Sequence, residues 1–280
     1  MHLATEQQTT PLRIVSIGQN AGAGRWRTQA MRSHATPRLI YITKGQGRIT
    51  VAGLTSGYGP NNLVLIPAHT MYGFDVGPTV FGYIVTVPSA MASEWPRTTV
   101  HLRLRDVIVQ KECGQMIEAL EREISGTNAG HARAAHYHLG LLAVFFDRQR
   151  NNAPQDTQAV RQNTSGARLV AAYTDLIARG YRDGRGVSDY AATLEVTPTH
   201  LTRCCNQACA KSALALLRDR VNYEACVMLR ETTTPVHEIA AQLGFTSAAY
   251  FTRSFAAQTG TTPSRFRKKG AASRHRDHPA

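Results

Sequence analysis

Long apolar runs, catalytic motifs and regularly spaced cysteines are all missing from this sequence of 280 residues. Its longest apolar run, Leu141 to Phe146, is far too short to cross a membrane. The N-terminal segment HLATEQQTTP has no apolar signal-peptide core. No phosphate-binding loop, dinucleotide-binding fingerprint or nucleophile motif occurs. We therefore expect a cytoplasmic protein that is not an enzyme and needs no cofactor.

Cysteine is scarce, with five irregularly spaced residues. An odd count suits a reducing compartment better than a disulfide framework. Cys204, Cys205 and Cys209 lie close together, but their spacing is not that of a zinc site and no histidine accompanies them at ligand spacing. We interpret them as small apolar core residues, with redox or metal sensing as the alternative.

Basic residues outnumber acidic ones, with 32 Lys and Arg against 19 Asp and Glu and a formal net charge of +13. This excess favours a polyanionic partner such as nucleic acid. Residues 1–165 carry 16 basic and 10 acidic residues, and residues 166–280 carry 16 and 9. Because the charge is spread evenly, it does not indicate which half would bind.

The segment VHEIAAQLGFTSAAYFTRSFAAQTGTTPSRFR, residues 236–267, predicts two short helices joined by a tight turn. Thr234 and Pro235 suit the start of the first helix, and Gly244 suits its end because glycine adopts a left-handed conformation at least cost. Ser247 can cap the second helix. The apolar stripe of that helix consists of Tyr250, Phe251 and Phe255. Two helices in this arrangement form a helix-turn-helix, whose second helix enters the major groove of DNA.

The outward face of the second helix is made of small residues and one arginine: Ala248, Ala249, Thr252, Arg253 and Ala256. Such a face suits close approach to DNA better than ordinary solvation. The alternative is a packed helical hairpin with an incidental arginine.

The same segment resembles the second helix-turn-helix of the AraC/XylS transcription regulators. The match is carried by Gly244, Phe245, Tyr250, Phe251, Phe255, Gly260, Pro263, Phe266 and Arg267. Residues 187–209, VSDYAATLEVTPTHLTRCCNQAC, repeat the layout, and ALALLRDRVNYEACVMLRET between the motifs predicts one long connecting helix. Residues 168–267 thus resemble the whole DNA-binding domain of the family. We assign residues 166–270 to a double helix-turn-helix domain and residues 271–280 to a basic tail.

Two positions depart from the family pattern in the first motif. Glu195 stands in its turn and Ala210 follows its second helix, where family members usually carry glycine or, in the turn, another turn-forming residue. A non-glycine residue in a left-handed conformation costs about 1 kcal/mol. We therefore expect the first motif to be looser, or its turn to be built differently.

Residues on both second helices are candidates for contact with DNA. The expected base contacts are Thr199, His200, Thr202, Arg203, Ala248, Ala249, Thr252 and Arg253. Arg203 and Arg253 would carry most of the specificity, because a guanidinium group can pair bidentately with guanine O6 and N7. Phosphate contacts that set the register are expected from Tyr250, Arg265, Arg267 and Lys268.

The N-terminal half predicts a β domain. After a polar arm, residues 1–12, short β-branched and aromatic runs punctuated by glycine begin at Leu39 and favour a small antiparallel barrel or jelly roll. The run LVLIPAHTMYGF resembles the cupin-type sensor barrel at the N-terminus of many AraC/XylS regulators. The predicted fold is α+β and multi-domain: a cupin-like, effector-sensing β-barrel within residues 1–105, covering helices, and an all-α C-terminal domain.

Residues 106–150 predict two helices. The first has apolar residues at helical spacing: Cys113, Ile117, Leu120 and Ile124. The second begins near Ala132 and ends with Leu142, Phe145 and Phe146. These helices cover the barrel, and the resemblance adds that such helices often carry the dimer contact, so we expect a homodimer. Residues 151–165, NNAPQDTQAVRQNTS, are polar and turn-rich and form the predicted linker.

Polar side chains of the β domain are candidates for binding a small molecule: His34, Tyr41, Arg48, His69, Tyr72 and Tyr83. Arg48 could pair with a carboxylate. Surface or core-edge positions are the alternative for each. Metal-binding cupins cluster their ligands as His-x-His followed by an acid, and this pattern does not occur in the barrel region, so we expect no metal site.

The resemblance implies a sequence-specific activator that binds promoter DNA, responds to a small-molecule effector and acts through RNA polymerase. The run MYGFDVGPTVFGYIVTVP, taken with LRDRVNYEA, resembles the branch that controls catabolism of hydroxylated aromatic acids, which implies an aromatic acid as effector. One alternative is a cupin-type metal-dependent enzyme or metal sensor with an accessory DNA-binding domain. Another is a nonspecific architectural DNA-binding protein, suggested by the evenly spread charge.

Overall fold

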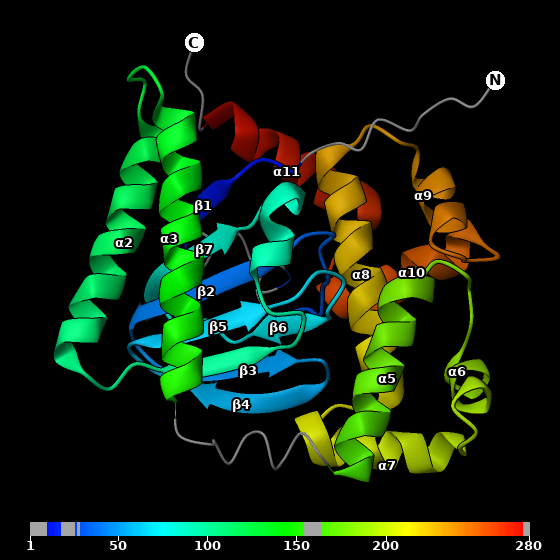
Figure 1. Ribbon diagram of the computed structural model, residues 1–280. Coiled ribbons are helices and arrows are strands. Elements are labelled where there is room, and N and C mark those ends of the chain that lie inside the picture. Colours follow the sequence, from blue (N-terminus) through cyan, green and yellow to red (C-terminus); the bar gives the residue numbers. More distant parts are fainter. Residues whose placement is uncertain (1–9, 18–25, 27–28, 154–163, 277–280) are drawn as a thin grey trace, which may run out of the picture.

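The computed structural model describes residues 10–17, 26, 29–153 and 164–276, the last six of these by their backbone alone. Two β-sheets lie in the middle of the molecule, with helices α2 and α3 on one side and helices α5 to α10 on the other, and α11 runs across the top between α3 and α8 (Figure 1). Most of the predicted arm and linker, residues 1–9 and 154–163, lies outside the described residues. None of the described helices is both long and apolar enough to span a membrane.

The β domain is built from two antiparallel sheets. The strands are β1 (Arg13–Ser16), β2 (Arg38–Lys44), β3 (Gly47–Val51), β4 (Leu54–Tyr58), β5 (Asn62–Ile66), β6 (Tyr72–Phe74), β7 (Phe81–Thr86) and β8 (Val100–Arg103). One sheet has the order β1-β7-β2-β5-β8 and the other β4-β3-β6. The described strands therefore form two facing sheets in the manner of a cupin-like jelly roll, and the expected barrel is not a closed ring of hydrogen-bonded strands.

The central strands β2 and β5 are buried on both faces. Ile40 and Val64 point between the two sheets, where they meet Ile49, Tyr72 and other residues of the small sheet. Their neighbours Leu39 and Leu63 point the other way. Because alternate residues of a strand face opposite sides, a strand buried on both faces reads as a continuous apolar run.

Helices α2 (Val107–Ser125) and α3 (His131–Asn152) cover the outer face of the five-stranded sheet. The Asp106 carboxylate caps α2 by accepting hydrogen bonds from the backbone N–H groups of Ile108 and Val109. The short 3₁₀ helix η2 (Ser89–Glu94) lies beside α3, where the Trp95 and Phe146 ring centroids are 5.6 Å apart. The helices predicted for residues 106–150 are thus present and pack on the sheet.

The C-terminal domain is entirely helical. Its elements are α5 (Ser165–Gly180), α6 (Val187–Thr193), α7 (Pro198–Cys209), α8 (Ala213–Glu231), α9 (Val236–Gln242), α10 (Ala248–Thr259) and α11 (Pro263–Arg276). The first half of α8 packs in one core with α5 to α7, and its second half packs in another with α9 to α11. Val221 touches both cores. One helix therefore fixes the two halves of the domain to each other.

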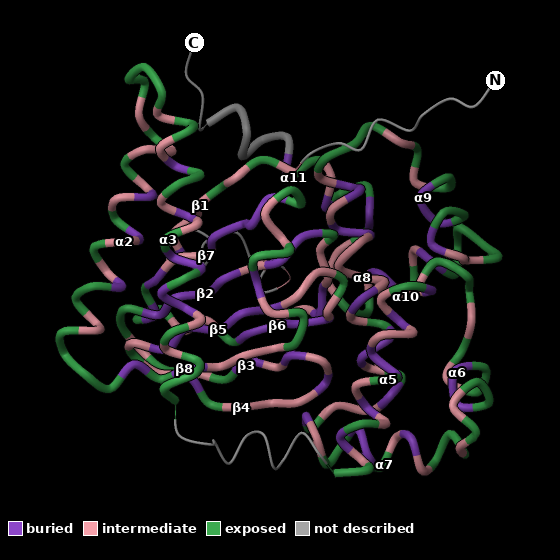
Figure 2. The backbone as a smooth tube through the Cα atoms, viewed as in Figure 1, coloured by how far each residue is buried: buried purple, intermediate pink, exposed green. Residues whose placement is uncertain are grey.

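The β domain and the helical domain share a core. Met31 and Met71, both from the β domain, are buried in the cluster that contains Val170 and Tyr173 of α5. The hairpin turn at Gly53 also lies against α5, where an added Cβ would meet Thr174 Cγ2 at 3.1 Å. Buried residues line the strands and the inner faces of the helices, and exposed residues mark the outer faces (Figure 2).

Candidate DNA-binding surface and effector cavity

The second helix-turn-helix consists of α9, a tight turn and α10. Leu243 ends the first helix, and Gly244 then adopts a left-handed conformation with φ of 76°. The Ser247 hydroxyl accepts a hydrogen bond from the backbone N–H of Tyr250 and caps α10. The expected start of α9 is wrong by one residue, because Pro235 is its N-cap rather than its first helical residue. No side chain caps that end.

Aromatic rings hold the second motif together. The Phe251 ring centroid lies 5.1 Å from that of Phe245 in the turn and 5.8 Å from that of Phe255. The Phe255 ring in turn meets Phe266 of α11 edge to face at 5.4 Å. Tyr250 departs from the predicted apolar stripe, since 50% of it is exposed. It lies one residue before the buried position of Phe251, where the helical rotation of about 100° per residue turns a side chain outward.

The residues predicted for the outward face of α10 reach its surface, with Ala256 half-buried. Ala248, Ala249 and Arg253 are exposed, and Thr252 is half-buried. The Thr252 hydroxyl donates to the carbonyl oxygen of Ala248 at 2.9 Å, which occupies its proton and leaves its methyl group free for contact. Arg253 makes no ion pair with any described carboxylate. Its guanidinium group therefore stays available at the surface.

The first helix-turn-helix has the same backbone as the second. Glu195 in the turn has φ of 56°, and its N–H donates to Ala192, as that of Gly244 does to Ala241. Ala210 ends α7 in a left-handed conformation, with φ of 55°. The expectation of a differently built turn is therefore wrong, because both departures adopt the conformation that glycine would adopt.

The predicted contact residues of α7 also lie on its outer side. Thr199 and Arg203 are exposed, and His200 and Thr202 are half-buried. The Arg203 guanidinium donates to His200 Nδ1 at 3.0 Å, and His200 Nε2 lies 3.7 Å from Cys204 Sγ. Arg203 is thus held by a histidine on its own helix, not by an internal ion pair with a described carboxylate.

The predicted phosphate contacts divide into two groups. Arg265 and Lys268 are exposed on α11, and Tyr250 is exposed on α10. The guanidinium of Arg267 is instead engaged inside the domain, where it donates to the carbonyl oxygens of Thr234 at 2.6 Å and Leu229 at 3.4 Å. These bonds join the end of α8 to the loop before α9, so the structure gives Arg267 a role in packing rather than at the phosphate backbone.

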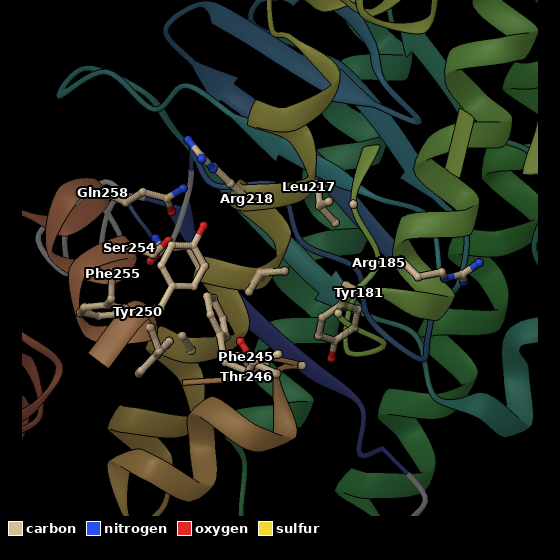
Figure 3. Close-up of a pocket in the computed structure, with 18 of the residues that line it drawn as sticks. Tyr181, Arg185, Leu217, Arg218, Phe245, Thr246, Tyr250, Ser254, Phe255 and Gln258 are labelled. Atoms are coloured by element: carbon tan, nitrogen blue, oxygen red, sulfur yellow. The ribbon is translucent and has the colours of Figure 1, made fainter. Parts of the chain in front are cut away.

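A hollow of about 290 Å³ lies between the two motifs, beside α8 (Figure 3). Tyr250, Ser254 and Gln258 of α10 line one side, and Arg218 of α8 and Arg185 before α6 also border it. Arg218 is exposed and was not in the predicted contact set. Arg218 lies on the connecting helix, outside both helix-turn-helix motifs, so the sequence patterns of these motifs do not indicate it.

The cysteines behave as core residues. All five are buried free thiols. Burial raises the pKa of the Cys205 and Cys226 thiols to about 12, so both stay protonated near neutral pH. Within the described part of the chain, no group of three or more His, Cys, Asp or Glu residues is placed to hold a metal ion.

A cavity of about 340 Å³ lies between the β domain and α8. Two of the six predicted effector residues, His34 and Tyr72, line it. Its arginines are Arg13, Arg32 and Arg38, which the sequence reasoning did not select, and Glu231 of α8 is the one acidic residue among the described residues that line it. Arg13 and Arg38 occupy the ends of two strands that border β7, and this placement follows from the sheet register, not from any local motif.

The charges of this cavity shape its titration. Burial, together with the guanidinium groups of Arg38 and Arg32, lowers the pKa of His34 to about 3, so its ring is neutral. Burial also lowers the pKa of Arg38. Arg32 is only 4% exposed and stacks on the Tyr72 ring, with its Cζ 4.4 Å from the centroid. The cavity is therefore a partly desolvated cationic site.

The other four candidates lie elsewhere. Tyr41 and Tyr83 belong to the core beneath α2 and α3, on the other face of the sheet. Arg48 and His69 are exposed. Tyr41 and Tyr83 face away from His34 and Tyr72 because neighbouring strand residues point to opposite faces. The His69 backbone N–H donates to the carbonyl oxygen of His34 at 2.7 Å, but the cavity lining includes none of the four residues.

A second cavity of about 710 Å³ opens between the small sheet and helices α5 and α7. Hydroxyl groups of Thr55, Ser56, Thr70 and Thr99 line it, with Arg97 and Arg168 among the charged residues. His101 also lines it and lies 2.7 Å from the Asn62 side-chain oxygen. Its described lining residues include two arginines and no acid, so their net charge equals that of the three arginines and Glu231 in the cavity at Arg38. It differs in having no Phe, Tyr or Trp among those residues.

Comparison with known proteins identifies both halves of the chain. Residues 13–142 match the family model for an AraC-like ligand binding domain, and residues 190–269 match the model for a helix-turn-helix domain. No curated protein sequence matches the chain.

Solved structures are similar at low identity. The C-terminal domain of AraT, a response regulator from Geobacillus stearothermophilus, is 25% identical over 38% of this chain and 88% of its own, with a TM-score of 0.36. ToxT from Vibrio cholerae, bound to an unsaturated fatty acid, is 11% identical over 95% of this chain and 97% of its own, with a TM-score of 0.45. The C-terminal domain of the response regulator yesN from Fusobacterium nucleatum is 23% identical over 34% of this chain and 93% of its own, with a TM-score of 0.33.

Proposed function

The chain belongs to the AraC/XylS family of transcription regulators, and we propose that it activates transcription from promoters that both of its helix-turn-helix motifs contact. A DNA-binding domain and a ligand-binding domain together make it a ligand-responsive regulator. In this proposal it works in the cytoplasm, binds double-stranded promoter DNA and recruits RNA polymerase.

The observation that supports two reading helices is their common construction. Arg203 and Arg253 stand at corresponding positions of α7 and α10, seven residues before the left-handed Ala210 and Gly260 that end these helices. Both arginines are exposed, and α8 joins the two units through a continuous core. Each arginine would read one major-groove segment, with Thr199, Thr202, Ala249 and Thr252 beside it.

Base-preference profiling tests this part of the proposal. The full chain is incubated with a randomised duplex pool, and the bound sequences are read. Arg253→Ala should lose preference at one base position of one half-site, and Arg203→Ala at one position of the other, with about 1–3 kcal/mol of discrimination lost in each case. Arg179→Ala, which removes an exposed arginine on α5, is the control. Uniform weakening across all sequences would instead indicate an architectural DNA-binding protein.

We also propose that the chain forms a homodimer through α3. Tyr137, Leu141 and Val144 stand at i, i+4 and i+7 of this helix and are exposed by 68%, 57% and 49%. Such a stripe of exposed apolar side chains is the pattern of a helix that packs against another helix. A two-fold symmetric contact would bury the stripe of one copy against that of the other.

The effector in this proposal is a small aromatic acid bound by the sensor domain, and its binding shifts the population of DNA-competent conformations. Guanidinium groups and aromatic rings in the cavity beside α8 support this class of ligand. Promoter output should rise when such an acid is supplied. A reporter gene that fails to respond to any metabolite in a broad screen would leave a constitutive DNA-binding protein.

A further inference from the structure

Three residues form a row across the wall of the cavity beside α8. In the register of the five-stranded sheet, Arg13 of β1 and Arg38 of β2 both lie opposite Thr86 of β7. All three line the cavity. Two guanidinium groups therefore flank one hydroxyl group, with one strand spacing between each arginine and the threonine. None of the described carboxylates forms an ion pair with Arg13 or Arg38.

An apolar row lies next to this polar row on the same face. Two residues further along the strands, Val15 and Ile40 both lie opposite Ile84. Val15 and Ile84 line the cavity, and Ile40 belongs to the buried core between the sheets. Residues two apart on a strand share a face, so the cavity wall passes from cationic to apolar over about 7 Å.

Aromatic rings form the rest of the cavity wall. Tyr72 and Phe74 come from the small sheet, and Trp26 lies 6.0 Å from the Tyr223 ring of α8. Arg32 stacks on Tyr72, and its Cζ also lies 5.3 Å from the Phe74 centroid and 5.9 Å from that of Tyr223. Stacking of this kind fixes the plane of a guanidinium group.

One stripe of α8 closes the cavity. Tyr223, Val227 and Glu231 follow each other at intervals of four residues and all line it. Tyr223 supplies a hydroxyl group, and its burial raises its pKa, so the hydroxyl keeps its proton. Because α8 belongs to the DNA-binding domain, a ligand that fills this cavity contacts both domains at once.

We infer that this cavity is a carboxylate-binding site in which Arg13, Arg38 and Arg32 hold the carboxylate of a monoanion and the apolar and aromatic walls hold a small aromatic body. A planar guanidinium group pairs bidentately with a carboxylate. Among the described lining residues, three arginines and one carboxylate, Glu231, leave an excess of positive charge, which an anion offsets. The inference rests on the proposed function and assigns its effector a location.

The site couples ligand to DNA through α8. The row of Arg13, Thr86 and Arg38, which would hold the carboxylate, belongs to the sensor sheet. Tyr223 and Glu231 lie on α8, whose two ends pack against the two reading motifs. A ligand that bridges the sheet and α8 biases the position of the connecting helix, which is the differential contact that a population shift needs.

The test uses the full chain and four probes: benzoate, its neutral isostere benzamide, octanoate and inorganic phosphate. The chain contains two tryptophans, of which Trp26 lines the cavity and Trp95 packs against Phe146 in the opposite core, so quenching of Trp26 reports occupancy. Arg38→Gln removes one charge of the row. The matched control, Arg103→Gln, removes an exposed arginine of β8, on the same sheet but outside the cavity.

We expect benzoate to bind at least tenfold more tightly than benzamide. Arg38→Gln should weaken the binding of benzoate at least tenfold, whereas Arg103→Gln should leave it unchanged. Comparison with octanoate shows whether the site prefers an aliphatic or an aromatic carboxylate. Tighter binding of octanoate or phosphate than of benzoate would overturn the assignment of the ligand as a small aromatic carboxylate. Without ligand, Arg38→Gln should raise the melting temperature, because it relieves repulsion within the arginine cluster.

Equal binding of benzoate and benzamide, equal effects of the two variants, or binding of none of the probes would overturn the inference. Selection of bound sequences from a randomised duplex pool, measured in parallel on the ligand-free chain, reports on the proposed function by itself. Selective DNA binding without benzoate binding would contradict the carboxylate site but support the proposed function as a sequence-specific regulator.

Discussion

Glu195 and Gly244 occupy the same backbone position in the two helix-turn-helix motifs, with φ of 56° and 76°. The next residue in each turn, Val196 or Phe245, donates its N–H to the carbonyl oxygen of Ala191 or Ala240, at 3.0 Å in both motifs. The tertiary structure of the first motif therefore imposes a left-handed conformation on a residue with a side chain.

Glu195→Gly should stabilise the protein. Relief of left-handed strain is worth about 1–2 kcal/mol, and the added freedom of glycine in the unfolded chain offsets about half of it, leaving a net gain of about 0.5–1 kcal/mol. Chemical denaturation measures the change. The reverse substitution, Gly244→Ala, should destabilise by about 2 kcal/mol or more, because its Cβ would lie 2.6 Å from the Arg182 carbonyl oxygen. A loss of stability in Glu195→Gly would contradict the strain.

The helix-turn-helix motifs could be predicted from sequence because their signals are local. Gly244, Ser247 and the spacing of Phe251 and Phe255 each determine a conformation within a few residues. Tyr250 was misplaced because a tyrosine next to a buried phenylalanine reads as apolar, although the helix turns it outward.

The ligand cavity could not be predicted in the same way. Both faces of β2 are buried, so the alternation of side chains does not show which face meets the cavity and which meets α2. The cavity joins Arg38 to Tyr223, residues far apart in the sequence that only the docking of α8 brings together. The sequence does show arginines at the ends of the predicted strands, but without the register of the sheet these arginines do not predict a shared cavity.

Arg265 and Arg267 should have opposite effects although they are two residues apart. Arg265 is exposed, whereas Arg267 donates to the carbonyl oxygens of Thr234 and Leu229. Arg267→Gln should lower the free energy of unfolding by about 1–3 kcal/mol, as expected for lost bonds from a charged donor. Arg265→Gln should leave stability unchanged and lower the slope of log affinity for DNA against log salt by about 1. Urea unfolding and DNA titrations at several salt concentrations distinguish the two, and equal stability of both variants would contradict the packing role of Arg267.

Glu224 should make the fold sensitive to acid. Its carboxylate accepts from Arg220 at 2.9 Å and Arg182 at 2.7 Å, and Arg220, which is 4% exposed, also stacks over the Tyr181 ring at 3.7 Å. Burial alone would raise the pKa of Glu224, but the two arginines outweigh it and lower the pKa below its usual value. The stabilisation is therefore complete above the pKa of the unfolded state and is lost as the pH falls through the lower pKa of the folded state.

Glu224→Gln should cost about 3 kcal/mol near neutral pH, because it leaves Arg220 buried without its counter-charge. The cost should shrink as the pH falls below the pKa of Glu224 in the unfolded state and then through its lower pKa in the folded state, because the wild-type carboxylate then also gains a proton. Asp175→Asn breaks the exposed pair with Arg179 and is the control, with a cost below about 1 kcal/mol. Denaturation at several pH values gives both quantities, and a cost that does not depend on pH would contradict the electrostatic origin.

Leu141→Glu should prevent dimer formation without unfolding the protein. Leu141 lies at the centre of the exposed stripe of α3, so a charge there would be buried in a dimer and solvated in a monomer. Light scattering should show the wild type as a dimer and the variant as a monomer with an unchanged melting temperature. The control is Val107→Glu, an exposed apolar residue at the start of α2 outside the stripe. A dimeric Leu141→Glu would place the interface on another surface.

Gly53 of the sensor domain packs against α5 of the DNA-binding domain. It forms the turn between β3 and β4 with φ of 74°, and an added Cβ would meet the side chains of Val170 and Thr174 on α5. Gly53→Ala should therefore destabilise the protein by about 2 kcal/mol, from left-handed strain and from separation of the hairpin from α5. Because Met31 and Met71 depend on the same docking to stay buried, thermal unfolding should broaden or divide into two transitions.

Gly59→Ala is the matched control, since no atom lies within 4 Å of its added Cβ. A single transition of unchanged midpoint in Gly53→Ala would show that the two domains do not depend on this contact.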